Sequence, residues 1–392
     1  MKNVGMAAVA ALSVGVIDCQ ADGAWRQAEF ALNLYRTVAE SKRGNFVLSP
    51  YGVASVFSLL GTGTRGKTQE AFSKVLGLDV SDANAVAKTF SGVRNGMPSS
   101  VGNISDSIWL VNRAKICPEF VDYARNGFGA EARTVALQQL YPAINAYVRG
   151  KTHGTINNLM RGSPGPLTRI TLVNTVYFLD KWQCKFDACK TQKSVFHSPG
   201  GDVMVQFMND RRNADFYYRA EFQLLRLPYR NTQFEMVLIL PASHLDEARF
   251  SSVLVPEALN CILDPMYYSW REVIISIPKF KFEVEHQLNS VLSRMGLDVA
   301  FKRGGDFSGI STNEGIYVSS ALQKAKIRVD EDGTEAAAAT AAVVLAECPG
   351  PSRPSPVEFI ADRPFLFVIR NRNDGTILFM GRVTDPSGKQ HQ

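Results

Sequence analysis

Residues 61–68 come nearest, of all segments in this sequence, to a known catalytic motif. They are Gly-Thr-Gly-Thr-Arg-Gly-Lys-Thr and match the G-x-x-x-x-G-K-T pattern of phosphate-binding loops. In such a loop the backbone N–H groups close on the phosphates, Lys67 would reach the outer phosphates and Thr68 would bind Mg²⁺. That geometry needs a strand directly before the loop, whereas residues 53–60 carry apolar side chains at helical spacing. We therefore expect residues 61–68 to form a turn between two helices, without a bound nucleotide.

Other catalytic arrangements are sparse. The five histidines are scattered, and H-E-x-x-H, G-x-S-x-G and C-x-x-C do not occur in the sequence. Asp330, Glu331 and Asp332 are adjacent acids, but on a strand, where we expect them, successive side chains point to opposite faces. No nucleophile has a base and an orienting group beside it. The sequence therefore predicts no enzyme, no metal site and no cofactor.

The composition sets further limits on the kind of protein. The chain has 392 residues, of which 45% are hydrophobic, enough for one large domain or two medium ones. Lys and Arg exceed Asp and Glu by 43 − 37 = 6, and no block of five or six like charges occurs. This mild excess describes a solvated, slightly basic surface, so we expect no nucleic-acid partner.

Residues 334–345 form an unusual segment, Thr-Glu-Ala-Ala-Ala-Ala-Thr-Ala-Ala-Val-Val-Leu, without Pro or Gly. Alanine has the highest helix propensity, so a surface helix is one interpretation. That helix would be nearly apolar all round, because Glu335 is its only charge. In a strand, one face would carry only small side chains: Thr334, Ala336, Ala338, Thr340 and Ala342. Small side chains and free N–H groups would let this segment be a loop in one state and a central strand in another.

The predicted secondary structure that must hold this segment changes along the chain from helices to strands. Helical periodicity dominates the first third, as in residues 30–38 and in residues 53–60 after the start signal Ser49-Pro50. Long apolar runs later in the chain predict buried strands at residues 170–178, 234–240, 273–277 and 365–369. Early helices and later long strands indicate an α+β domain with a substantial sheet.

The sequence resembles the serpins over essentially the whole chain after its N-terminal segment. Residues 330–340, Asp-Glu-Asp-Gly-Thr-Glu-Ala-Ala-Ala-Ala-Thr, match the hinge of inhibitory serpins almost residue for residue. Further serpin-like motifs lie at residues 45–50 (Asn-Phe-Val-Leu-Ser-Pro), 172–178, 227–229, 277–280, 306–310, 362–365 and 379–383. Residues 51–56 and 321–324 look most like the branch that contains plasminogen activator inhibitor type 1.

The resemblance implies a serpin fold, with helices packed on three β-sheets, a large central sheet and an exposed reactive loop at about residues 331–360. The hinge residues that it implies are Glu331, Gly333, Thr334, Ala336, Ala338 and Thr340. A target serine protease would attack the loop and form a covalent acyl-enzyme complex, and the cut loop would enter the central sheet with the protease attached. The alternative is a non-inhibitory serpin, a carrier or signalling protein, whose loop is simply cut.

Two ways of counting along the family pattern give two scissile bonds. Sixteen positions after Glu331 lies Glu347, followed by Cys348. Counting back from the motif at residues 362–365 gives Arg353, followed by Pro354. The two results differ by 353 − 347 = 6, so the loop carries about six additional residues.

Physical arguments favour the first bond for inhibition. The inserted strand has a fixed length, and additional chain between it and the protease would weaken the distortion. Arg353 precedes a proline, which lacks an N–H and restricts the residue before it, so this bond should be a poor one for trypsin-like enzymes. Cleavage after Leu345 or Ala346 by an elastase-like enzyme stays open.

The resemblance assigns Trp182, Asn174, Ser49 and Gln323 to the breach and shutter regions of the central sheet. Gln323 stands where many serpins carry histidine, and Gly52 stands where serine is common. Glutamine still hydrogen-bonds but does not titrate, so this change should alter the pH sensitivity and leave the mechanism in place.

A helix expected at residues 82–93 offers Lys88, with Arg94 next to it, to polyanions. Two positive charges make a weak site, so any heparin or glycosaminoglycan binding is expected to be weak. We expect the protein to be a monomer.

The N-terminus has the pattern of a secretory signal peptide. Lys2 precedes an apolar run of about 13 residues, and polar residues begin at Asp18, so we expect a signal at residues 1–21 and one domain at residues 22–392. That run is too short to span a bilayer comfortably, and no later stretch is apolar enough, so we expect a secreted, extracellular protein. Asn103 begins an N-glycosylation sequon.

Six cysteines bear on the redox state. If Cys19 leaves with the signal, an odd number remains, which means at least one free or intermolecular thiol. Cys184 and Cys189 either form a local disulfide or are two unpaired, buried thiols. The pairing of Cys117, Cys261 and Cys348 stays open.

Overall fold

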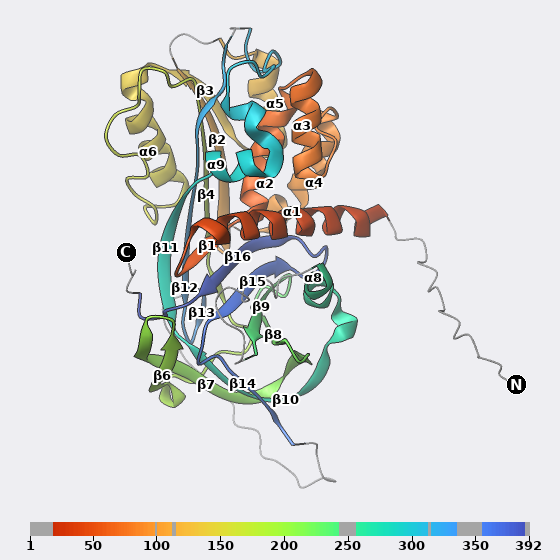
Figure 1. Ribbon diagram of the computed structural model, residues 1–392, viewed down its shortest axis with the longest axis vertical. Helices are drawn as coiled ribbons and strands as arrows, with labels where there is room; N and C mark the ends of the chain where they lie inside the picture. The colour runs from red at the N-terminus through yellow and green to blue at the C-terminus, as the bar shows by residue number, and fades with distance from the viewer. Residues whose placement is uncertain are drawn as a thin grey trace, which may run out of the picture.

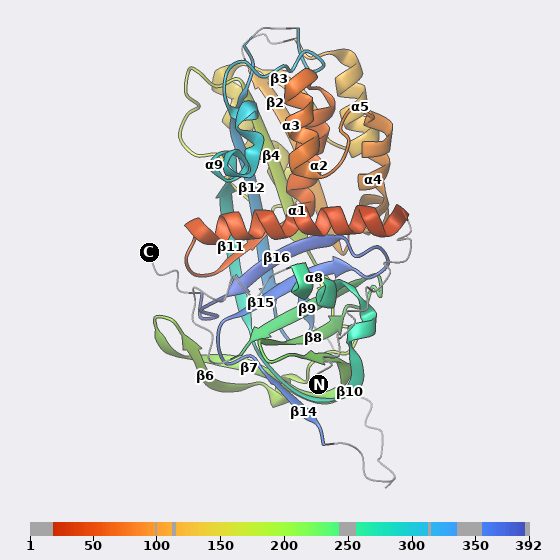
Figure 2. The same cartoon turned by 45° about the vertical axis from the view of Figure 1, so that its right-hand side comes forward.

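The computed structural model describes residues 19–98, 100–111, 115–242, 256–312, 315–334 and 355–388. A long helix, α1 (Cys19–Ser41), crosses the middle of the molecule between a helical half and a half rich in strands, as Figures 1 and 2 show. The other helices are α2 (Pro50–Thr62), α3 (Gly66–Leu76), α4 (Ala83–Gly96), α5 (Pro118–Phe128), α6 (Leu140–Lys151), α8 (Pro256–Leu263) and α9 (Asn289–Leu292).

The large central sheet has seven strands. Their order is β3 (Glu131–Val135), β2 (Gly102–Val111), β4 (Ile170–Phe178), β12 (Val318–Val329), β13 (Gly333–Thr334) and β5 (Asp180–Lys181), and β11 (Phe280–Gln287) also pairs with β12. β4 and β12 are parallel, from Val318 opposite Ile170 to Lys326 opposite Tyr177. Each of them has an antiparallel partner on its other side, β2 and β11. We call the contact between β4 and β12 the parallel seam.

A second sheet has nine strands: β1 (Phe46–Leu48), β16 (Ile377–Val383), β15 (Phe365–Asn371), β9 (Phe234–Pro241), β8 (Phe222–Pro228), β7 (Gly201–Tyr218), β10 (Ser269–Pro278), β14 (Val357–Ile360) and β6 (Gln192–Ser198). β7 is 18 residues long and pairs with β6, β8 and β10. Because this one strand joins two groups of strands, two of the three expected sheets share a continuous hydrogen-bonded ladder. Within the expected loop range, residues 333–334 and 357–360 are strands.

The predicted elements agree with the structure where the periodicity is strong. The strand predicted at residues 170–178 is β4, and the other three predicted strands lie within β9, β10 and β15. Ser49 caps α2 by accepting a hydrogen bond from the Gly52 N–H, as the Ser49-Pro50 start signal indicates.

Residues 61–68 connect two helices, as predicted. α2 precedes them instead of a strand, and α3 begins at Gly66. The Thr64 hydroxyl donates to the Gly61 carbonyl, and Thr68 Oγ accepts from the Asp306 N–H at 2.9 Å. Both threonines are buried, so these hydroxyl groups serve internal contacts and do not form a phosphate site.

Two apolar clusters hold the layers together. The larger one packs α1 and α2 against both sheets. The smaller one lies between α6 and the central sheet, where Leu140, Ile144 and Val148 meet Trp109, Val173 and Leu322 of β2, β4 and β12. α6 therefore covers the parallel seam on one face and has to yield if the seam opens.

A buried ionic cluster fixes β8, β9 and β15 to one another. Glu235 is 1% exposed and accepts hydrogen bonds from Arg226 at 2.6 Å and from Arg370 at 2.7 Å. The Arg226 guanidinium also lies over the Tyr268 ring, 4.6 Å from its centroid. Removing one member of such a cluster leaves the others charged and desolvated, which is strongly destabilising.

We predict that Glu235→Gln lowers the free energy of unfolding by about 3–5 kcal/mol, because buried Arg370 loses its counter-charge and buried Arg226 keeps only the more distant Asp215. The matched control is Glu221→Gln, whose carboxylate lies 4.0 Å from Arg219 on the surface, and which should cost less than about 1 kcal/mol. Urea unfolding followed by tryptophan fluorescence measures both. Equal losses in the two variants would show that the buried cluster adds no more stability than a surface pair.

Candidate functional site

The hinge begins where β12 ends. Residues 330–333 form a turn closed by two hydrogen bonds, Asp330 N–H to Gly333 O and Gly333 N–H to Asp330 O. The chain then enters β13, where Thr334 pairs with Val329 of β12 and with Asp180 of β5. Gly333 has φ +151°, and a Cβ there would lie 2.2 Å from the Asp180 carbonyl oxygen. Only glycine fits so close to the Asp180 carbonyl, so Gly333 determines the point at which the loop meets the sheet.

The three hinge acids lie in this turn, not on a strand as we expected. Each is paired with a cation: Asp330 with Arg328 (3.0 Å), Glu331 with Lys279 (2.8 Å) and Asp332 with Lys185 (2.7 Å). Burial would raise the pKa of Glu331, but the hydrogen bonds it accepts, from Lys279 and Thr191 among others, and the Lys279 charge hold that pKa below its ordinary value. The acids therefore anchor the turn to β12, to Lys279 between β10 and β11, and to the connection between β5 and β6, and do not form a proton-transfer pair.

Trp182 supports the hinge from the end of β5. Its indole N–H donates to the Asp330 carbonyl at 2.9 Å, and its ring is stacked on Tyr229 at 4.7 Å between centroids. The Tyr229 hydroxyl is hydrogen-bonded to the Thr334 hydroxyl at 2.7 Å. Burial raises the pKa of Tyr229, so this hydroxyl stays protonated. Trp182 and Thr334, both predicted as site residues, thus meet through a tyrosine that the sequence analysis did not assign.

The three predicted shutter residues meet in the middle of the parallel seam. Gln323 of β12 accepts from the Ser49 N–H at 2.8 Å, donates to the Ser49 carbonyl at 2.9 Å and donates to Asn174 Oδ1 at 2.7 Å. Asn174 lies on β4 and Ser49 precedes α2, and none of the three is accessible to solvent. One amide therefore joins both edges of the seam to the helix beneath it.

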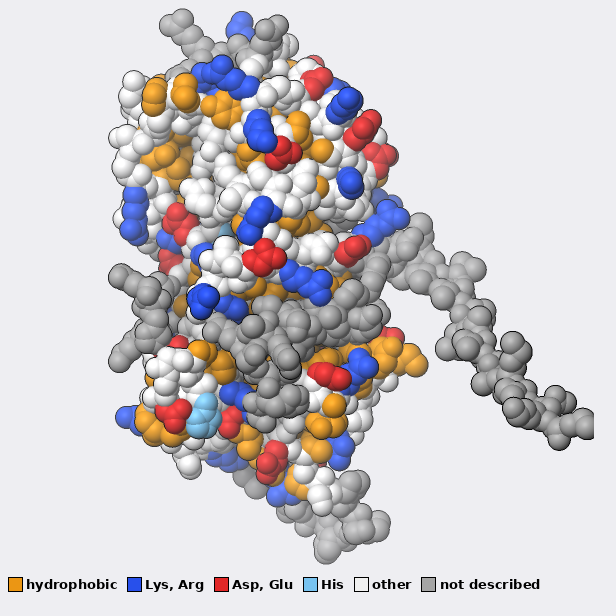
Figure 3. All heavy atoms as spheres, viewed as in Figure 1, with side chains coloured by type: hydrophobic (Ala, Val, Ile, Leu, Met, Phe, Trp, Pro, Cys, Tyr) orange, Lys and Arg blue, Asp and Glu red, His pale blue; other side chains and the backbone are white. Residues whose placement is uncertain are grey.

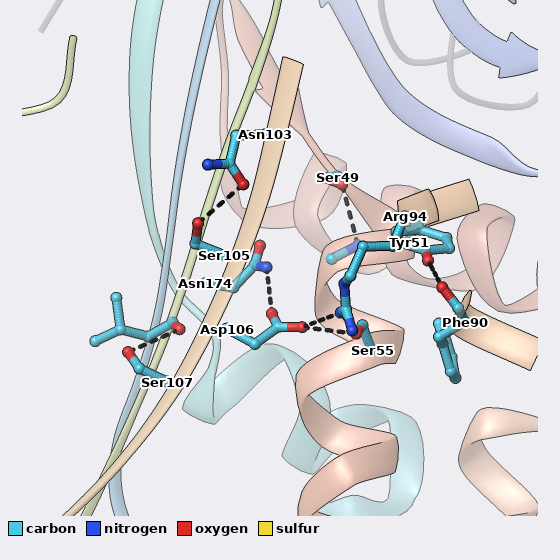
Figure 4. A network of polar contacts seen from close by, with 12 residues as sticks. Ser49, Tyr51, Ser55, Phe90, Arg94, Asn103, Ser105, Asp106, Ser107 and Asn174 are labelled. Carbon is cyan, nitrogen blue, oxygen red and sulfur yellow. Dashed lines mark hydrogen bonds and ion pairs between the residues drawn. The ribbon is translucent and has the colours of Figure 1, made fainter. Parts of the chain in front are cut away.

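Figure 4 shows that this network continues through Asp106 of β2. Asp106 accepts from Asn174 Nδ2 at 2.7 Å, from the Ser55 hydroxyl at 2.6 Å and from Arg94 at 3.2 Å. Burial raises the pKa of Asp106, and the Arg94 charge opposes that shift. Sequence reasoning missed Asp106. The available signal was a lone acid between the apolar residues Ile104 and Ile108.

Gly52 makes room for this arrangement. A Cβ at this position would lie 2.4 Å from Asn174 Oδ1, the atom that accepts from Gln323. A serine, which we noted as common here, would therefore require a different Asn174 position. Gly52 and Gln323 both depart from the family pattern, and both lie against Asn174.

The remaining predicted residues lie elsewhere. Lys88 is exposed on α4, but Arg94 points inward to Asp106, which leaves one of the two cations proposed for a polyanion. Asn103 lies on β2, and its Nδ2 donates to the Lys151 carbonyl at 2.8 Å, a bond that a glycan would replace. Cys184 and Cys189 are free and exposed, which corrects the two expectations of a disulfide and of buried thiols, and Cys117 and Cys261 are also free.

Ala336, Ala338, Thr340, Glu347, Cys348, Arg353 and Pro354 lie outside the described residues, as does most of the expected signal peptide. Within the described part of the chain, no cluster of three or more His, Cys, Asp or Glu is arranged to bind a metal ion. In that same part, no helix combines the length and apolar character that crossing a bilayer requires.

The described fold has a large central sheet in which β12 leads through the hinge turn into β13. The family description "Serpin (serine protease inhibitor)" matches residues 26–386. Leukocyte elastase inhibitor from Sus scrofa is 32% identical, covering 91% of this chain and 97% of that protein. Plasminogen activator inhibitor 1 from Neovison vison is also 32% identical, covering 91% and 92%. The chain belongs to the serpin family, which confirms the expected resemblance.

Solved structures agree. Serpin48 of the insect Tenebrio molitor, described as a highly specific serpin, has a TM-score of 0.82 at 29% identity and covers 95% of this chain and 100% of its own. Thyroxine-binding globulin, solved in complex with thyroxine, has a TM-score of 0.81 at 23% identity, with 93% and 99% covered, and shows the fold alone. The predicted fold class is confirmed. Serpins are protease inhibitors rather than enzymes, although the fold also occurs in this hormone-binding protein.

The shutter also contains a buried histidine. His286 of β11 lies opposite Gln323 in the ladder, is 2% exposed and is hydrogen-bonded through Nε2 to the Val47 carbonyl at 2.8 Å. Burial and the Lys42 charge lower the pKa of His286 to about 4, and the Val47 carbonyl opposes them in part. Histidine is therefore present in this region, one strand away from position 323.

We predict that the folded protein loses about 3 kcal/mol of stability between pH 6.5 and pH 4 through His286. The pKa of His286 in the folded state lies below the ordinary value of 6.5. As the pH falls, the unfolded chain therefore binds a proton at this histidine before the folded protein does. The contribution of neutral His286 to stability is complete above pH 6.5 and is lost as the pH falls towards 4. In urea unfolding at both pH values, His286→Gln should reduce this loss. His197→Gln, at an exposed position on β6, should leave it unchanged, and equal behaviour of the two variants would contradict the assignment.

Proposed function

We propose that the protein is a secreted suicide inhibitor of a serine protease. The observation that carries this proposal is the position of β13. Thr334, the first of the small residues, already pairs with β12 and β5 at the end of the parallel seam. Continued in that direction, the loop would form a strand between β4 and β12. The extracellular location is part of the proposal and rests on the N-terminal signal pattern.

In the proposed reaction the serine hydroxyl of the protease attacks the carbonyl carbon of the scissile residue. The peptide C–N bond breaks, the new amino terminus leaves with a proton supplied by the protease, and an ester joins the two proteins. Insertion of about 14 residues forms a strand of roughly 45 Å at about 3.3 Å per residue, which carries the protease along and distorts its active site before hydrolysis. The native form is then a kinetically trapped state.

The shutter must open for this to occur. The bond between Gln323 and Asn174 spans the seam and has to break, whereas the bond between Asn174 and Asp106 joins β4 to β2 and can persist. Asn174 would move together with β2, and Gln323 would remain with β11 and β12. A backbone N–H or carbonyl of the inserted strand can replace the lost partner, which leaves no buried polar group unpaired.

We assign the scissile bond to Glu347–Cys348, with Arg353–Pro354 as the alternative. The support for the first bond is the fixed length of the inserted strand. The additional six residues would then lie between the bond and β14, which begins at Val357. They would lengthen only the part of the loop that does not insert.

Incubation with a panel of serine proteases, followed by denaturing gels and sequencing of the fragments, tests the proposal. A complex that survives denaturation supports inhibition, and the fragment termini identify the bond. Clean cleavage by every protease without a complex would overturn the proposal. That outcome favours the second function, a non-inhibitory carrier or signalling serpin, for which the thyroxine-binding globulin fold provides the precedent.

We predict that Thr334→Arg converts the inhibitor into a substrate. Thr334 is 1% exposed and its hydroxyl contacts Tyr229, so an arginine cannot occupy β13 without burying an unpaired charge and would displace the hinge from the point where insertion begins. The covalent complex should fall at least about tenfold and the cleaved form should rise, as densitometry measures. Thr89→Arg, at an exposed position on α4, is the control. Unchanged complex formation in Thr334→Arg would contradict insertion at the hinge.

A further inference from the structure

Large apolar side chains are exposed together at the connection between α8 and β10. Met266 is 82% exposed, Trp270 is 69% exposed and Tyr267 is 43% exposed. We call these three residues the apolar patch. In Figure 3 hydrophobic side chains gather at the right-hand edge of the lower half, where Figure 1 shows this connection. Groups of large exposed apolar side chains commonly mark interaction sites on soluble proteins.

The apolar patch is held in place by its surroundings. The Tyr267 ring meets the Tyr217 ring at 5.9 Å between centroids, and Tyr217 also contacts Tyr268. Asp264 accepts a hydrogen bond from the Met266 N–H at 2.9 Å and fixes the turn. Tyr268 lies over Arg226 of the buried ionic cluster. Tyr267 and the backbone of this turn therefore lose little conformational entropy when a partner binds.

The position of the apolar patch relates it to the reactive loop. β10 and β14 are parallel, with Val273 opposite Val357. Trp270 precedes Val273 by three residues, about 10 Å along the strand at roughly 3.3 Å per residue. The reactive loop enters β14 at the same end, where Ser355 is exposed. Trp270 therefore flanks the point at which the loop leaves the body of the protein.

We propose that the apolar patch is a docking surface for the body of the target protease, outside the bond that is cut. This inference rests on the proposed function, since it is the attack on the loop that brings a protease to this end of the molecule. The described chain resumes at Ser355, just before β14, so the protease proposed to attack the preceding segment is brought to this end of the molecule, where Trp270 is exposed. Tryptophan is the residue most enriched at the energetic centres of interfaces. The patch would set which protease is captured and how fast.

The test uses the full chain with Trp270→Ala and Met266→Ser, separately and together. The control is Leu167→Ser, a 62% exposed apolar residue just before β4, at the opposite end of the seam from the hinge. With a protease that forms the covalent complex, Trp270→Ala should slow association about tenfold, and the control should not. The stoichiometry of inhibition should stay unchanged, because the hinge is intact. An unchanged association rate in the double variant would overturn the inference.

A second measurement separates this inference from the proposed function. Each variant is titrated with a protease whose catalytic serine is replaced by alanine, which binds but cannot form the ester. Weaker binding of Trp270→Ala supports the docking surface even if the covalent complex never forms. Equal binding of all variants, or no binding, would overturn it. Light scattering of the protein alone provides the other contradicting outcome: a dimer lost in Trp270→Ala would assign the apolar patch to a second copy of the chain.

Discussion

The Gln323 amide makes three hydrogen bonds in the middle of the central sheet, two to the Ser49 backbone and one to Asn174. They close a seam between two parallel strands that otherwise depends on ladder hydrogen bonds and on the cover supplied by α6. A buried hydrogen bond of this kind contributes about 1 kcal/mol net, whereas an unpaired amide costs about 1–3 kcal/mol. The closed seam is therefore the more stable arrangement. Opening it lowers the free energy only if a new strand supplies hydrogen-bond partners for the separated groups.

The contacts around the seam divide the sheet into two parts. Asp106 joins Asn174 to Ser55 and Arg94, so β4 is tied to β2, α2 and α4. β12 is tied to β11 and, through Gln323, to Ser49 at the start of α2, and the hinge acids extend that side through Lys279 and Lys185. Glycine at position 52 leaves room for the observed Asn174 side chain, and glycine at position 333 is required because a Cβ there would collide with the Asp180 and Lys181 backbone. The loop is thus held at its start, at the point where the proposed insertion would begin.

Much of this could be predicted from the sequence. A run rich in apolar and β-branched residues marked β4 to the residue, and the small residues after Gly333 indicated a segment able to change from loop to strand. The network around Asp106 could not be predicted, because an acid in an apolar strand has no local signal for its partners, which come from α2, α4 and β4. Arg94 was misplaced for the same reason: helical position alone does not tell whether a long cation faces solvent or a buried carboxylate. The turn at residues 330–333 was predicted as a strand, since its form depends on Gly333 and on contacts with β5.

The proposed mechanism requires the parallel seam to take up the cut loop as a strand. The most direct test is the unfolding temperature of the protein before and after a single cut in the loop, at a bond that leaves the hinge intact. Insertion adds a fully paired central strand, so the cut protein should unfold at a temperature higher by tens of degrees, because each kcal/mol gained raises the midpoint by a few degrees. An unfolding temperature that stays the same or falls after the cut would contradict the claim.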